Sequence, residues 1–165
     1  MLHRIRLAGP WEIGRRELSD DDAGARPSVS VAVDPDARGA PAVSGGVEAA
    51  RLRLPIEWKS LIAAVREEFP VGGPARMTRI FHRPTGLEAG DRLWVGAAGW
   101  PATVHVSLNG HPLGRLDPWC DDQRWPITDR LELTNRLSVE FSTGDGRLDD
   151  FQVEVGQFWL DIESS

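Results

Sequence analysis

The fold is indicated most clearly by residues 92–116, which read RLWVGAAGWPATVHVSLNGHPLGRL. Residues 92–98 are apolar after Arg92, and 102–108 alternates apolar and polar side chains, so both segments are typical of β-strands. Asn109-Gly110 follows, and this dipeptide is the strongest short signal for a hairpin, since both residues tolerate the positive φ of a tight turn. The chain then returns over 111–116. The stretch therefore predicts three short strands, the last two joined as a hairpin.

Similar strand signals flank this stretch in both directions. Alternating or apolar runs lie near Ile5 and Leu7 and at 29–33, 51–54, 77–83, 124–127, 136–142 and 151–162. Gly, Pro, Asn and Asp separate most of these runs, as is typical of turns between short strands. About eight short strands at this spacing predict an all-β protein built as an antiparallel two-sheet β-sandwich.

One short helix is expected beside the strands. Apolar residues recur at three- and four-residue spacing from Trp58 to Val65, which is the pattern of one buried helix face. Four tryptophans in or beside the expected elements are interpreted as core packing. They are Trp11, Trp58, Trp94 and Trp159.

The chain has 165 residues, a length that suits one domain. We therefore expect a single domain over 1–165. Residues 19–50 are rich in Asp, Ala, Gly, Pro and Ser and contain only the short strand expected at 29–33. This composition predicts a low-complexity, loop-rich insertion within the domain.

Charge and composition exclude several classes of protein. The chain has 25 acidic residues against 19 Lys and Arg, a net charge of −6 that disfavours nucleic acid as a partner. No window approaches the roughly 18 apolar residues that span a membrane, and the N-terminus lacks the apolar region of a secretion signal. A cytoplasmic location without membrane association is therefore expected. The single cysteine, Cys120, excludes an internal disulfide and a cysteine-rich zinc site.

A series of short motifs runs through the chain. They are Gly9-Pro10-Trp11-Glu12, Leu54-Pro55 with Trp58, Arg79-Ile80-Phe81-His82-Arg83-Pro84, Gly90-Asp91-Arg92-Leu93-Trp94-Val95, Val106-Ser107-Leu108-Asn109-Gly110 with Leu113-Gly114, and Ile127-Thr128-Asp129 with Asn135-Arg136-Leu137-Ser138-Val139. In order and spacing, the series resembles the N-terminal sugar-binding-type domain of glycoside hydrolase family 2, the group of the β-galactosidases and β-glucuronidases. The resemblance covers most of the chain from Leu54 onward.

This resemblance implies a jelly roll of the galactose-binding-like type, here as a stand-alone domain. In that family the catalytic carboxylates lie in a separate barrel domain, for which a chain ending at Ser165 has no room. Paired acids such as Asp121-Asp122 or Asp149-Asp150 could in principle serve acid–base chemistry, but adjacent residues on a strand point to opposite faces. We therefore expect a protein that is not an enzyme.

Hairpin connectivity predicts a candidate binding site at one end of the sandwich. Each antiparallel connection reverses the chain, so the loops at 72–74, 99–101, 117–122 and 143–150 should emerge at the same end. Indole rings stack on the C–H faces of sugars, and carboxylates accept hydrogen bonds from sugar hydroxyls. The tryptophans and aspartates of these loops are therefore the predicted sugar-binding residues. They are Trp100, Trp119, Asp117, Asp121, Asp122, Asp145, Asp149 and Asp150.

Two other interpretations of these residues remain open. The tryptophan rings could simply cover the open end of the sandwich, with the aspartates acting as solvated turn formers. The same carboxylates could instead hold Ca²⁺, a hard cation that takes about six to eight oxygen ligands. No other cofactor is indicated by the sequence.

Two functions follow from these observations. The first is a non-catalytic carbohydrate-binding module, supported by the resemblance and by the two loop tryptophans. The second is a structural or protein-interaction jelly roll without a sugar ligand, which would dock on another subunit. The missing secretion signal favours the second, because a polysaccharide binder should meet its ligand outside the cell. The expected partner is therefore a carbohydrate or a protein.

Overall fold

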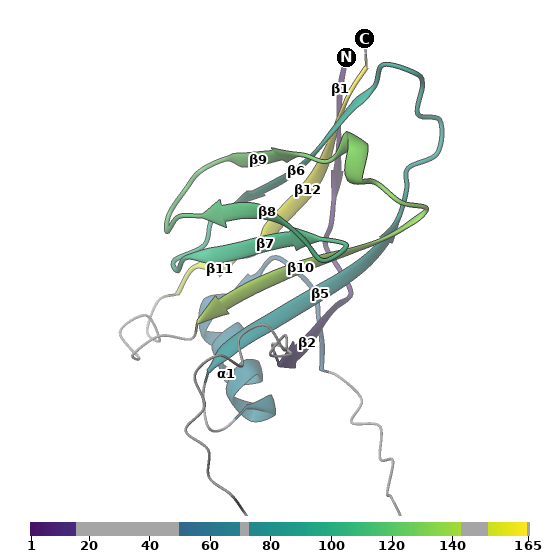
Figure 1. Cartoon of the computed structure of the whole chain (residues 1–165). Helices are drawn as coiled ribbons and strands as arrows, with labels where there is room; N and C mark the ends of the chain where they lie inside the picture. The colour runs from purple at the N-terminus through teal and green to yellow at the C-terminus, as the bar shows by residue number, and fades with distance from the viewer. Residues whose placement is uncertain (16–49, 70–72, 143–151, 165) are drawn as a thin grey trace, which may run out of the picture. The chain divides into compact units, whose positions relative to one another are not determined.

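The structure is a computed structural model that describes residues 1–15, 50–69, 73–142 and 152–164. All described elements belong to one compact unit, formed by Met1–Arg16 and Ala49–Ser165. They comprise two antiparallel sheets, a separate two-stranded ribbon, one α-helix and one short 3-10 helix (Figure 1). The prediction of an all-β antiparallel sandwich with one short helix is therefore confirmed.

The two sheets differ in size. The four-stranded sheet consists, in spatial order, of β1 (Leu2–Arg6), β12 (Gln157–Glu163), β6 (Arg92–Ala98) and β9 (Gln123–Pro126). The six-stranded sheet consists of β3 (Arg51–Leu52), β2 (Trp11–Arg15), β5 (Pro74–His82), β10 (Thr134–Ser142), β7 (Val104–Leu108) and β8 (His111–Leu116). The ribbon pairs β4 (Ile56–Glu57) with β11 (Glu154–Val155). The helices are α1 (Trp58–Glu68) and η2 (Thr128–Arg130).

The predicted hairpin at Asn109-Gly110 joins β7 to β8. Both turn residues have a positive φ, 52° and 81°, which a tight hairpin turn requires. The Asn109 side chain fixes the turn to neighbouring backbone. Its Oδ1 accepts a hydrogen bond from the amide of Arg136 at 2.8 Å, and its Nδ2 donates to the carbonyl of Arg130 at 3.1 Å. Residues 92–116 thus form β6, β7 and β8, although β6 lies in the opposite sheet from the β7–β8 hairpin.

Trp100, in the connection from β6 to β7, lies at the centre of the core. Its side chain is fully buried. Its ring centroid is 5.4 Å from that of Phe141 on β10, 5.8 Å from that of Phe158 on β12 and 6.3 Å from that of Trp58 on α1. One indole therefore contacts both sheets and the helix. Aromatic pairs of this kind add about 0.5–1.5 kcal/mol each beyond the burial of their area.

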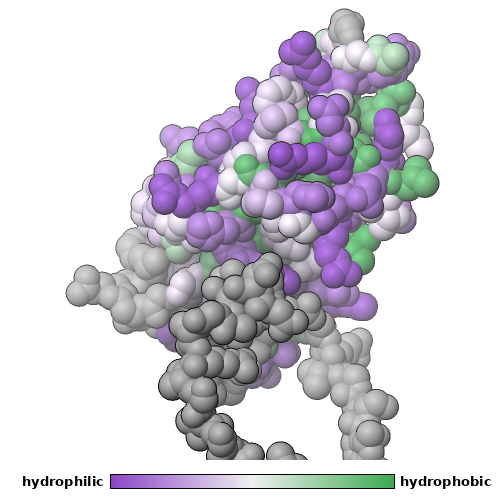
Figure 2. All heavy atoms as spheres, viewed as in Figure 1, coloured by the Kyte–Doolittle hydropathy of each residue, from purple (hydrophilic) through white to green (hydrophobic). Residues whose placement is uncertain are grey.

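Helix α1 uses the apolar face that its sequence predicts. Trp58, Leu61, Ile62 and Val65 are all buried against the core. By contrast, the face of the molecule in Figure 2 is mostly hydrophilic, and hydrophobic residues appear there in small, separate groups. Among the described residues, no helix is long and apolar enough to cross a membrane.

The last predicted strand, 151–162, is divided in the structure. Gly156 separates β11 from β12 and has a φ of 85°, which residues with a side chain rarely adopt. A Cβ at this position would also overlap the side chain of Leu54. The break lets β11 pair with β4 while β12 pairs with β1 and β6. The predicted strand at 29–33 lies outside the described residues, as does the predicted insertion at 19–50 except for Ala50.

Trp100→Ala should destabilise the protein by about 3–5 kcal/mol, because it removes a fully buried indole and leaves a cavity among aromatic rings. Guanidinium unfolding followed by circular dichroism measures this loss. Trp119→Ala is the matched control, since that side chain is 49% exposed and its removal should cost less than about 1 kcal/mol. Equal losses in the two variants would contradict the central position of Trp100.

Candidate functional site

The loops at 99–101 and 117–122 lie side by side, as hairpin connectivity predicts. The amide of Trp119 donates to the carbonyl of Trp100 at 2.7 Å, and a second backbone hydrogen bond of 3.2 Å runs the opposite way. The second loop is therefore attached directly to the core connection between β6 and β7.

Trp100 is not a binding residue, and its prediction as a sugar-stacking platform is wrong. Its indole is buried among the core aromatic rings, so neither ring face can reach a ligand. Trp119 is different, because its side chain is 49% exposed at the tip of the loop. Its φ of 61° is uncommon for a bulky residue. Only one of the two predicted tryptophans is therefore placed to meet a ligand.

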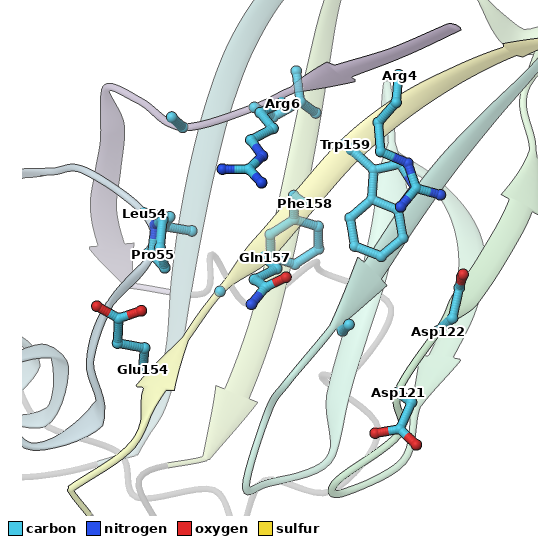
Figure 3. A pocket seen from close by; sticks show the side chains of 14 residues that line it. Arg4, Arg6, Leu54, Pro55, Asp121, Asp122, Glu154, Gln157, Phe158 and Trp159 are labelled. Carbon is cyan, nitrogen blue, oxygen red and sulfur yellow. The ribbon is translucent and has the colours of Figure 1, made fainter. Parts of the chain in front are cut away.

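The described aspartates of this loop are all exposed but have different surroundings. Asp117 forms a salt bridge with Arg115, with 2.9 Å between Oδ1 and Nε. Asp121 and Asp122 instead line a pocket on the four-stranded sheet (Figure 3). The other three predicted acids lie outside the described residues, and their place in a site stays a prediction. They are Asp145, Asp149 and Asp150.

The pocket lies on the outer face of the four-stranded sheet, the face turned away from the sandwich core. Its volume is about 350 Å³, within the range of about 300–1,000 Å³ that is usual for small-ligand sites. Its charged and polar lining residues are Arg4, Arg6, Asp121, Asp122, Glu154 and Gln157, beside the ring of Trp159. Leu54, Pro55, Ala98 and Phe158 contribute apolar parts of the wall.

Strand alternation explains why this face is polar. Along β12, Phe158, Leu160 and Ile162 belong to the core cluster, and the residues between them point the other way. Those residues are Trp159 and Asp161. The sheet therefore has an apolar inner face and a separate outer face that carries charge.

Arg4, Trp159 and Asp161 form a fixed cluster on one wall of the pocket. Arg4 donates from Nε to Asp161 Oδ1 at 2.7 Å and from Nη2 to Oδ2 at 2.9 Å. Its guanidinium lies over the Trp159 ring, with 4.3 Å between Cζ and the ring centroid. Trp159 Nε1 also donates to Asp161 Oδ2 at 3.0 Å. Each of the three side chains thus holds the other two in position.

Gly96 on β6 provides the space in which the Trp159 ring lies. A Cβ at Gly96 would overlap the indole atoms of Trp159. Only glycine therefore allows this ring to approach the strand so closely.

Asp161 is ionised although its side chain is fully buried. Burial alone would raise the pKa of this carboxyl, but hydrogen bonds from Arg4 and Trp159 and the charges of Arg4 and Arg124 hold the pKa below its usual value. The hydrogen bonds that Arg4 donates to Asp161 also raise the pKa of Arg4 above its ordinary value. The positive charge of Arg4 is therefore largely committed to Asp161.

Five other lining side chains keep their hydrogen-bonding groups available for a ligand. Within the described residues, none of them has a salt bridge or a side-chain hydrogen bond. They are Arg6, Asp121, Asp122, Glu154 and Gln157. Figure 3 shows Arg6 and Glu154 toward Pro55, the two aspartates on the opposite side, and Gln157 between them. The arrangement suits a ligand with several polar groups.

Sequence reasoning found only part of this pocket. It identified Asp121 and Asp122 but missed Arg6, Glu154 and Gln157. It also interpreted Trp94 and Trp159 as core packing. Trp159 is indeed buried, but strand alternation places both tryptophans on the outer face of the four-stranded sheet, outside the core cluster. The available signal was the alternation of apolar residues with Trp159 and Asp161 along the last strand.

The interpretation of the loop acids as a Ca²⁺ site gains no support from the described part of the chain. Within those residues, no group of three or more His, Cys, Asp or Glu side chains is arranged to hold a metal ion.

Comparison with known proteins identifies the fold. No protein-family model matches the chain, and no curated protein matches it in sequence. Solved structures do match. The FMN-binding β-glucuronidase of Facaelibacterium prausnitzii L2-6 is 18% identical with a TM-score of 0.61. The β-glucuronidase of Bacteroides uniformis is 15% identical with a TM-score of 0.61. That of an uncultured Clostridium sp. is 14% identical with a TM-score of 0.63.

These matches cover nearly all of this chain but a small part of each neighbour. They include 98%, 98% and 99% of this chain and 22%, 18% and 29% of the three β-glucuronidase chains, in the order given above. This chain therefore spans about a fifth of the first two. At such low sequence identity the likeness establishes the fold alone. The protein has the fold of a β-sandwich domain found in glycoside hydrolase family 2 enzymes.

Asp161→Asn should destabilise the protein by about 1–3 kcal/mol at pH 7, because Arg4 loses its charged partner. The folded-state pKa of Asp161 is depressed, so its stabilising contribution is complete above the unfolded pKa of about 4 and is lost as the pH falls toward the folded value. Wild type and variant should therefore converge in stability in acid. Urea unfolding at neutral and acidic pH measures the loss of stability and its dependence on pH.

The matched control for this experiment is Asp117→Asn, which breaks an exposed ion pair and should cost less than about 1 kcal/mol. A stability gap between wild type and Asp161→Asn that stayed constant from neutral to acidic pH would contradict the role of the ionised carboxylate.

Gly96→Ala should displace the Trp159 ring and reduce stability by about 1–3 kcal/mol, because the new methyl group occupies the space of the indole. Thermal unfolding measures the loss, and the indole N–H resonance of Trp159 in an NMR spectrum reports the displacement. Gly14→Ala is the control, since a Cβ at that strand position meets no atom within 4 Å. An unchanged Trp159 resonance in Gly96→Ala would show that the ring is not held over this strand.

Proposed function

We propose that this protein is a non-catalytic carbohydrate-binding domain whose site is the pocket on the outer face of the four-stranded sheet. The observation that best supports this is the set of available polar side chains around the pocket, described above. Guanidinium, carboxylate and amide groups are planar and carry paired donors or acceptors. Such groups match the adjacent hydroxyls of a sugar ring, while the apolar wall near Pro55 suits its C–H faces.

The fold comparison favours a sugar over other polar ligands. The neighbouring structures are named as β-glucuronidases and, in Bacteroides fragilis, as a putative β-galactosidase. This support rests on analogy of fold, and the pocket side chains carry the specific chemical argument.

The proposal of a non-catalytic role rests on the chemistry of the buried carboxyl. A glycosidase needs a carboxyl group with a raised pKa that can give a proton to the leaving oxygen. The pKa of Asp161 is lowered instead, and both of its oxygens accept hydrogen bonds from Arg4. Asp161 therefore stabilises the wall of the pocket and is not suited to donate a proton.

Arg6→Ala and Gln157→Ala should each weaken sugar binding about tenfold, since each removes hydrogen bonds to the ligand worth about 1.4 kcal/mol. A glycan-array screen of the purified protein identifies the sugar, and titration calorimetry measures its Kd. Arg83→Ala removes an exposed arginine that does not line the pocket and should leave the Kd unchanged. Circular dichroism checks that each variant is folded.

Two results would overturn this proposal in different ways. Loss of binding in Trp119→Ala, with normal binding in both pocket variants, would move the sugar site to the loop tip. No signal from any glycan, with the fold intact, would contradict carbohydrate binding altogether.

The second candidate, a structural or protein-interaction domain, would be favoured by such a result. It is supported by the match to about a fifth of the neighbouring chains, as expected of one domain among several.

A further inference from the structure

The charges around the pocket do not balance. Three carboxylates line it, those of Asp121, Asp122 and Glu154. Two guanidinium groups line it as well, but the charge of Arg4 is committed to the fully buried Asp161 beneath it. The charge of Arg4 also acts on Asp122, so Arg6 and part of the Arg4 charge offset the three carboxylates. The lining residues still carry an excess of negative charge, because three carboxylates stand against two guanidinium groups.

The excess of negative charge is concentrated on one side of the pocket. In Figure 3, Asp121 and Asp122 come from the same loop and lie on the side away from Pro55, whereas Arg6 and Glu154 lie on the Pro55 side. The two aspartates are adjacent in the chain and have no salt-bridge partner within the described residues. A cationic group bound there would be attracted by two carboxylates, and the attraction would be stronger inside a partly enclosed pocket than on an open surface.

The other side of the pocket disfavours a ligand that is only cationic. Arg6 would repel a second positive charge, and its guanidinium requires acceptor oxygens. Gln157, between the two sides, offers one donor group and one acceptor group to hydroxyls. A suitable ligand therefore carries an ammonium group at one end and several hydroxyl oxygens at the other.

We infer that the pocket selects amino sugars, with the protonated amine against Asp121 and Asp122 and ring hydroxyls against Arg6 and Gln157. This inference rests on the proposed function and specifies its ligand class. The volume of about 350 Å³ suits a single sugar or a short terminal segment. Neutral sugars of the same shape bind more weakly, because they bring no positive charge to the two carboxylates.

The test compares three sugars at pH 6, where an aliphatic amine is protonated and exposed carboxylates are ionised. NMR titration gives the Kd for D-glucosamine, for D-glucose and for N-acetyl-D-glucosamine, which carries no charge. D-glucosamine should bind about tenfold more tightly than either neutral sugar. Raising the ionic strength to about 0.5 M should remove most of this preference, since salt screens exposed charges.

Asp121→Asn and Asp122→Asn should each reduce the ratio of D-glucosamine affinity to D-glucose affinity, because each removes one negative charge from the pocket and keeps an oxygen that can accept a hydrogen bond from either sugar. Both residues are exposed, so neither substitution should disturb the fold. Asp129→Asn is the matched control, because it removes one exposed carboxylate that does not line the pocket. The preference of this control variant for D-glucosamine should equal that of the wild type.

The outcomes separate this inference from the proposed function. Equal affinity for all three sugars, lost in Arg6→Ala, would overturn the amino-sugar selection and leave carbohydrate binding in place. A preference for D-glucosamine that survives both aspartate substitutions would also overturn it. Binding of none of the three sugars, and of no glycan on the array, would overturn the proposed function and the inference together.

Discussion

The burial of Trp100 between the sheets is the contact on which the other parts of this domain depend. Its ring lies 5.4 Å from Phe141 of one sheet and 5.8 Å from Phe158 of the other, measured between centroids. This indole therefore links the two layers at the end where the loop at 117–122 is attached. Because the amide of Trp119 binds the carbonyl of Trp100, the loop takes its position from the core. A pocket lined partly by this loop is thus positioned by packing in the interior.

The two faces of the four-stranded sheet carry different side chains, apolar on one face and largely charged or polar on the other. Its inner face supplies apolar residues such as Leu160 to the core, and its outer face holds the buried carboxylate of Asp161 beneath a polar pocket. A buried carboxylate is costly unless hydrogen bonds and opposite charge compensate it. Arg4 and Trp159 provide that compensation for Asp161. The same contacts immobilise one wall of the pocket, so stability and site geometry are coupled here.

Much of the fold could be predicted from local patterns. Strands β6 and β8 begin and end where the sequence predicts, and the hairpin turn lies at Asn109-Gly110, because these signals depend only on neighbouring residues. The division of the last strand at Gly156 was not visible, since it depends on the approach of Leu54 from a distant segment. Two residues of the pocket, Asp121 and Asp122, were singled out from the sequence because loop parity draws attention to their loop, but parity could not indicate the pocket that they line.

The sequence by itself determined the class of fold, the turn chemistry and the alternation that gives each strand an inner and an outer face. These follow from propensity and periodicity within a few residues. Only the tertiary structure decided that Trp100 is buried while Trp119 is exposed, because both follow similar turn signals in neighbouring loops. Only the tertiary structure also paired Arg4 with Asp161, which are 157 residues apart. The physical reason is that strand pairing between β1 and β12 sets this contact, and no local pattern encodes the partner of a strand.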